Sequence, residues 1–198
     1  TAVGNRRSTF AFASDTEVRT AFDNLWTDVY GKAIFNKWPE ISSDTGFATS
    51  KELIALASMT WNGGSGILGP KLRAAVQAGD RAAAWYEIRY GSNGGSSKGE
   101  GLAKRRYVES QLFGLYNSPA TVTPDEAKQV FAMLTNHRID ILAYEATYGI
   151  PPDGTSATRN MIALANADAN LSNIATAQSL FDALIPARNA FITWLNTQ

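Results

Sequence analysis

Residues 102–116 read LAKRRYVESQLFGLY, and their apolar spacing predicts an α-helix with one buried face. Arg106 and Glu109 are three residues apart, so their side chains can share one face of this helix. Leu102 and Phe113 lie one and two turns away from Arg106, which places the pair at the edge of the apolar stripe. We therefore expect an Arg106–Glu109 ion pair that is at least partly buried and fixes helix packing. Arg105 is rotated away from the stripe and could reach an anion or a glycan.

Helix signals also dominate on both sides of this stretch. Capping boxes at 14–17 and 49–52 predict a first helix that stops at Gly31 and a central helix over 50–61. Residues 32–48 are expected to be irregular, because they contain a proline and a cluster of turn residues. Further helices are expected over residues 70–79, 80–90, 102–116, 123–148, 156–166 and 176–195.

The expected fold class is therefore all-α, with about seven helices. Pro186 should kink or divide the last of them. The alternative is an α+β fold with a small N-terminal hairpin, since Thr9–Ala13 is the one short strand candidate in the sequence. We expect a single helical domain that comprises residues 1–48 (a helix and an irregular segment), 49–116 (a helical lobe) and 117–198 (a C-terminal helical extension).

The composition is that of a globular domain and excludes several kinds of chemistry. Of the 198 residues, 44% are hydrophobic and 18% charged, which is too apolar for a disordered chain. Lys plus Arg equals Asp plus Glu, 18 each, so no net charge steers the molecule to nucleic acid or to an anionic membrane. The chain has no cysteine, which excludes disulfides, Cys-ligated metals and Cys nucleophiles. No apolar run is long enough for a membrane span, and no motif predicts a cofactor or a metal site.

His137 is the only histidine, so a Ser-His-Asp triad or a His-rich metal site would have to use it. Its spacing from Val130, Leu134 and Ile141 places it on the apolar stripe of the 123–148 helix. We interpret it as a core histidine rather than a catalytic one. Any chemistry of this chain is therefore expected to depend on carboxylates.

Trp61 and Asn62 end the central helix where the chain breaks into a glycine-rich turn. An aromatic ring beside an amide is a common arrangement in sugar-binding sites, because the ring stacks on a sugar face while the amide bonds hydroxyl or N-acetyl groups. The alternative for Trp61 is an ordinary place in the core.

Several short pieces occur in one order along residues 49–116. They are SMTWNGG (58–64), LGPKL (68–72), AGD (78–80), WYEIRY (85–90) and GLAKRRYVESQLF (101–113). This order resembles the helical lobe of phage-type lysozymes, glycoside hydrolase family 24, and the Arg-Arg-x-x-Glu-x-x-Leu-Phe run is its most specific part. Residues 117–198 are similar to the tails of lysozyme-like modules in large secreted bacterial proteins.

The resemblance implies cleavage of the glycan backbone of peptidoglycan. In that family a glutamic acid ends an early helix, and an Asp and a Thr follow it on a short β-hairpin in a Glu-x8-Asp-x5-Thr arrangement. This arrangement is not found before Ser50, so no catalytic residue is carried over. The groove positions carried over are Trp61, Asn62, Arg105, Arg106 and Glu109. Glu87 and Glu109 are the remaining candidates for a general acid, which would need a pKa raised by burial.

Three hypotheses follow from these observations. The first is a muramidase-type peptidoglycan hydrolase module, either intact with a diverged catalytic acid or lacking that acid. The second is a non-catalytic helical module that binds a glycan or a protein as part of a larger secreted bacterial protein, and the third is a purely structural domain. The first two predict a secreted or cell-envelope location, peptidoglycan or another glycan as partner, and further domains outside this chain. The start at Thr1 agrees with a processed product or an excised domain.

Overall fold

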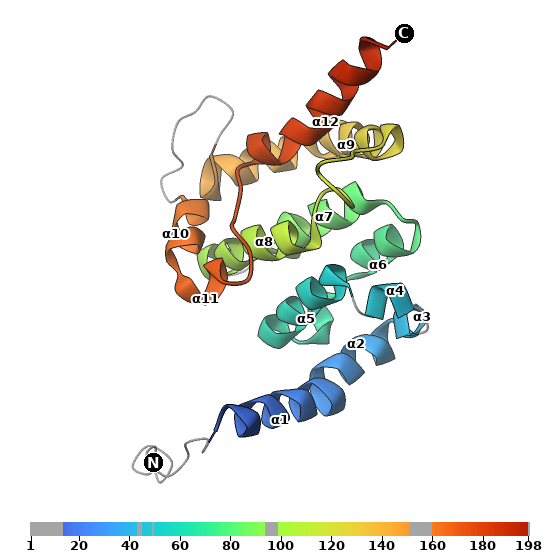
Figure 1. Cartoon of the computed structure of the whole chain (residues 1–198). Coiled ribbons are helices and arrows are strands. Elements are labelled where there is room, and N and C mark those ends of the chain that lie inside the picture. The colour runs from blue at the N-terminus through green and yellow to red at the C-terminus, as the bar shows by residue number, and fades with distance from the viewer. Residues whose placement is uncertain (1–13, 43–44, 49, 94–98, 151–159, 198) are drawn as a thin grey trace.

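The computed structural model describes residues 14–42, 45–48, 50–93, 99–150 and 160–197 (Figure 1). All regular structure in these ranges is helical and none of it is a strand, which confirms the all-α prediction. The strand candidate Thr9–Ala13 lies outside the described residues. Within the same ranges, no helix is long and apolar enough to cross a membrane.

The N-terminal part is more helical than predicted. Helix α1 (Asp15–Leu25) continues through a π-helical turn, η2 (Trp26–Tyr30), directly into α2 (Gly31–Lys37). Gly31 is therefore not a stop, and that prediction is wrong. A Cβ at Gly31 would lie 2.9 Å from the carbonyl oxygen of Trp26, so glycine allows the close approach that the wide π-helical turn needs.

The described residues between 32 and 48 are also mostly helical and not irregular, because α2 is followed by the short helices α3 (Pro39–Ser42) and α4 (Thr45–Ala48). Ile34, Trp38 and Ile41 are all buried in one core cluster with residues of the central helices. Burial against those helices stabilises a helical path that the turn residues alone do not favour. These short helices, with α11 below, make the described helices more numerous than the seven expected.

The middle of the chain is packed around one helix. The elements are α5 (Lys51–Gly63), η3 (Ser65–Ile67), α6 (Pro70–Gln77), α7 (Arg81–Arg89), η4 (Gly91–Asn93) and α8 (Gly99–Phe113). Helix α8 lies at the centre, in contact with α5 and α7 of this part and with α10 of the C-terminal part (Figure 1). It begins at Gly99, three residues earlier than predicted, and ends at Phe113. The side chains of Ser50 and Asp80 cap α5 and α7, and Pro70 is the first residue of α6.

The C-terminal extension packs on this centre through a long helix. It consists of α9 (Pro124–Tyr148), α10 (Met161–Ala167), α11 (Ala169–Ser172) and α12 (Leu180–Leu195). The capping box of Thr123 and Glu126 opens α9 as predicted. At His137 the backbone of α9 departs from helical geometry, with φ −119° and ψ 17°. Pro186 lies inside α12 without dividing it.

Candidate functional site

The exposed end of α5 carries an aromatic pair. Trp61 is 51% exposed, so it is not a core residue, and its ring packs against Tyr30 of η2 with ring centroids 4.4 Å apart. Tyr30 is half-buried and is held by the helix that runs from α1 into α2. One part of the indole surface is thus fixed by Tyr30 while the rest is open to solvent.

Asn62 lies beside Trp61 and is exposed. Its side-chain nitrogen donates to the carbonyl oxygen of Ser58, one turn earlier, at 2.8 Å. The side-chain carbonyl oxygen and the second N–H of Asn62 remain for a ligand. The two residues carried over from the family pattern at this helix end are therefore consecutive and both exposed.

Arg106 and Glu109 form the predicted ion pair, and it is completely buried between α5 and α8. The hydroxyl of Ser58 donates to Oε1 of Glu109 at 2.7 Å, while Arg106 binds Oε2. Two nitrogens of Arg106, Nε and Nη2, are buried and find no partner among the described residues. Burial raises the pKa of the Glu109 carboxyl, although Arg106 and Ser58 act in the opposite direction. With 1% exposure, Glu109 cannot reach a glycosidic oxygen in this conformation.

Arg105 takes a different position from its neighbour. Its side chain is half-buried on α8, and its positive charge lies close enough to Glu109 to contribute a small lowering of that carboxyl's pKa. Arg106, in contrast, is buried and does not contact solvent. It supports α5 from below through Glu109 and Ser58. Of the carried-over positions, Trp61 and Asn62 are accessible together.

Glu87 lies in separate surroundings on α7. Its carboxylate lies directly over Gly91. A Cβ added to Gly91 would be only 2.5 Å from Oε2 of Glu87, so a larger residue there would need the Glu87 side chain to shift. Burial raises the pKa of Glu87, and the charges of Lys71 and His137 oppose the shift. Glu87 is half-buried, so it combines a raised pKa with access to solvent.

His137 lies at the distortion of α9, next to these surroundings. Its ring stacks on Tyr86 with centroids 3.9 Å apart, and the hydroxyl of Tyr86 donates to Asp140 at 3.4 Å. Burial first, and then the negative charges of Asp140 and Glu87, raise the pKa of Tyr86 to about 12. The histidine is half-buried and packed on an aromatic ring, so it lies at the edge of the core and not inside it as we expected.

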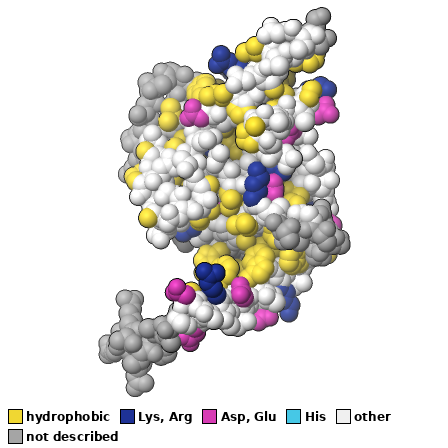
Figure 2. Space-filling model, viewed as in Figure 1, with side chains coloured by type: hydrophobic (Ala, Val, Ile, Leu, Met, Phe, Trp, Pro, Cys, Tyr) yellow, Lys and Arg dark blue, Asp and Glu magenta, His cyan; other side chains and the backbone are white. Residues whose placement is uncertain are grey.

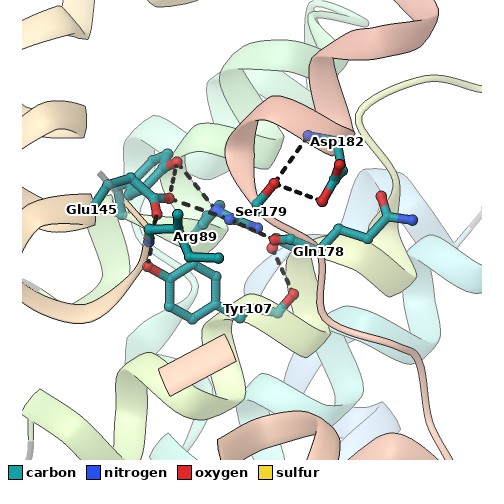
Figure 3. A network of polar contacts seen from close by, with 9 residues as sticks. Arg89, Tyr107, Glu145, Gln178, Ser179 and Asp182 are labelled. Carbon is teal, nitrogen blue, oxygen red and sulfur yellow. Dashed lines mark hydrogen bonds and ion pairs between the residues drawn. The ribbon is translucent and has the colours of Figure 1, made fainter. Parts of the chain in front are cut away.

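A buried network around Arg89 was not predicted from the sequence (Figure 3). Arg89 Nη2 donates to Oε1 of Glu145 at 3.2 Å and to the carbonyl oxygen of Gln178 at 2.9 Å. The hydroxyl of Tyr90 donates to the same Glu145 oxygen at 2.7 Å, and that of Tyr107 donates to Oε2 at 3.3 Å. The guanidinium also lies over the Tyr107 ring, 4.2 Å from its centroid. This network ties α7, α8 and α9 to the segment before α12.

A pocket of about 440 Å³ opens at the other end of α5. Phe47, Val76 and Phe113 contribute apolar surface to it, and Glu52 and Arg81 form an ion pair of 2.6 Å in its wall. Arg81 is also committed to the carbonyl oxygens of Phe113 and Gly114, so the pair holds α5, α7 and the end of α8 together. The pocket and Trp61 lie at opposite ends of α5.

Two of the candidate features reach solvent. They are the indole of Trp61 with the amide of Asn62, and the carboxyl group of Glu87. Among the described residues, no cluster of three His, Asp or Glu side chains could hold a metal ion. Comparison with protein-family models, with curated proteins and with solved structures finds no match to this chain.

Proposed function

We propose that this chain is a lysozyme-like helical module that binds the glycan strand of peptidoglycan at the Trp61 surface, defined by Tyr30, Trp61 and Asn62. The observation that carries the proposal is the half-exposed indole of Trp61, fixed from one side by Tyr30 and flanked by an exposed amide. A sugar ring presents an apolar face for stacking and polar groups at its edge, and this surface offers a partner for each. The proposal implies a secreted or cell-envelope location.

The buried ion pair supports this surface from below. Ser58 bonds Glu109 with its hydroxyl and Asn62 with its carbonyl oxygen, so one turn of α5 connects the pair to the exposed end. Because the pair lies inside the protein, the last turn of α5 is held in place before any ligand arrives. A ring that is already immobile loses less conformational entropy on binding.

Replacing Trp61 by alanine is expected to weaken binding to purified, insoluble peptidoglycan by about tenfold, because loss of one aromatic stacking contact costs about 1.4 kcal/mol. The bound fraction is measured by sedimentation over a range of peptidoglycan concentrations. Phe131→Ala is the control, since Phe131 is an aromatic residue of α9 that is 72% exposed and belongs to neither α5 nor η2. Equal binding by Trp61→Ala and wild type, or no binding by the wild type, would contradict the proposal.

A second candidate function is hydrolysis of the same glycan with Glu87 as the general acid. The observation that favours it is the raised pKa of Glu87 in a half-buried position, because a general acid must keep its proton near neutral pH. A glycosidase also needs a second carboxylate or a placed water near the anomeric carbon. Hydrolysis therefore requires a second catalytic group in addition to Glu87, whereas glycan binding requires none.

Release of reducing sugar from purified peptidoglycan tests the second candidate. If Glu87 is the acid, Glu87→Gln is expected to lower the rate by at least about 100-fold, because general acid catalysis contributes that much. Asp125→Asn is the control, since this carboxyl is 86% exposed at the start of α9. The absence of release by the folded wild-type chain would reject hydrolysis and leave the binding proposal intact.

A further inference from the structure

The helix that runs through α1 and η2 carries an apolar stripe that no described residue of the chain covers. Val18, Phe22, Leu25 and Val29 follow one another at helical spacing, and each is between 42% and 58% exposed. No residue of α1 is buried. In Figure 2, hydrophobic side chains reach the surface where this helix meets the body of the molecule. An amphipathic helix with an uncovered apolar stripe is a typical interaction surface.

A second uncovered apolar surface lies on the last turns of α12. Phe191, Ile192, Trp194 and Leu195 are all about half exposed, and Phe191 and Trp194 stack on each other with centroids 6.0 Å apart. Helix α12 packs on α9, but its final turns extend past the body (Figure 1). Helices α1 and α12 project from opposite ends of the molecule, so the two surfaces cannot cover each other within one chain.

The two surfaces match in length. The stripe from Val18 to Val29 spans about 17 Å at 1.5 Å per residue. The second surface extends back along α12 to Ile185, which is 45% exposed, and from Ile185 to Leu195 it spans about 15 Å. Each is thus long enough to cover the other as a pair of packed helices.

Their charges are complementary as well. Between 15 and 30 the first helix carries four carboxylates, Asp15, Glu17, Asp23 and Asp28, and a single base, Arg19. From Ile185 to Leu195 the second carries Arg188 and no acid. Two copies of the acidic helix would repel each other, whereas an acidic helix beside a basic one is attracted.

We propose that this chain associates head to tail, with the α1–η2 stripe of one copy packed against the final turns of α12 of a second copy. The contact joins two different surfaces, so each added copy leaves one of each surface open, and association continues into open chains or closes into a ring. A symmetric dimer would stop at two copies. The proposal does not rest on glycan binding, because the stripe residues Val18, Phe22, Leu25 and Val29 and the α12 surface include none of Tyr30, Trp61 and Asn62.

Two double variants and their mixture test this arrangement by analytical ultracentrifugation. Val18→Glu with Phe22→Glu places charges in the α1 stripe, and Phe191→Glu with Leu195→Glu places them in the α12 surface. The wild-type chain is expected to sediment with a mass that rises with concentration beyond that of a dimer. Each double variant alone is expected to remain at the 21.4 kDa of one chain. A 1:1 mixture of the two is expected to form a dimer and stop there, since each variant still has one intact surface.

Matched controls place the same charges at the same spacing on the polar faces of both helices. They are Thr20→Glu with Asn24→Glu on α1, and Asn189→Glu with Thr193→Glu on α12. Both are expected to associate beyond a dimer as wild type does, but at somewhat higher concentration, because the added carboxylates weaken the attraction between the helices without entering the apolar contact. All variants are checked by circular dichroism for unchanged helix content. A monomeric wild type, a mixture that remains monomeric, or a double variant that still dimerises alone would overturn the head-to-tail arrangement.

Discussion

Replacing Glu145 by alanine is expected to lower the free energy of unfolding by about 3–5 kcal/mol. Glu145 and Arg89 are both completely buried, and Glu145 is the carboxylate that neutralises the Arg89 guanidinium. The substitution leaves that positive charge in the interior, and it removes the acceptor used by the hydroxyls of Tyr90 and Tyr107. A buried charge without its partner is among the costliest defects in a protein.

Thermal and urea unfolding followed by circular dichroism measure this loss. For a chain of this size the midpoint temperature should fall by about 6–20 °C. Lys128→Ala is the control, because Lys128 pairs with Asp125 at the surface, where both side chains are mostly exposed. Its effect should stay below about 1 kcal/mol. A Glu145→Ala protein within about 1 kcal/mol of wild type would show that Arg89 is neutralised in another way.

The second large effect is expected at the Arg106–Glu109 pair. Glu109→Ala should also cost about 3–5 kcal/mol, since Arg106 already has two unpaired nitrogens and would lose its one anionic partner. The hydroxyl of Ser58 would lose its acceptor in the same step. The measurement is again the free energy of unfolding from urea titration.

A double replacement separates the cost of a broken pair from the value of the intact one. Arg106→Met combined with Glu109→Leu removes both charges and fills much of the same volume with apolar atoms. Because apolar side chains do not need the hydration that buried ions lose, the double variant should recover most of the stability lost in Glu109→Ala. If it is less stable than the single variant, the intact pair itself supplies a large net stabilisation, contrary to this expectation.

Most helices were predictable because their ends are signalled within a few residues. The proline at 70 and the capping box at Thr123 each begin a helix where expected, and α5 is capped by Ser50, one residue after the cap expected at position 49. The segment 32–48 was not predictable, since its local sequence favours turns and its helices depend on burial of Trp38 and its neighbours against a distant part of the chain. By local rules Gly31 should end a helix, but here it follows the π-helical turn directly, and its N–H bonds the carbonyl oxygen of Trp26.

The candidate site, too, was predictable only in part from the sequence. The shared helix face of Arg106 and Glu109 follows from a spacing of three residues, and the exposed end of α5 follows from the glycines after Asn62. The Arg89–Glu145 pair joins residues 56 apart in sequence, and helical periodicity says which face a residue occupies but not which helix will cover it. The one local signal was a charged residue, Glu145, in line with the apolar stripe of α9.

The Arg89 network also bears on how the chain is made. During synthesis Arg89 emerges from the ribosome 56 residues ahead of Glu145 and 89 ahead of Gln178. Until Glu145 arrives, water is the best available partner for the guanidinium, so α7 has no stable buried position. The nascent chain therefore completes its interior only when α9 and the segment before α12 have emerged.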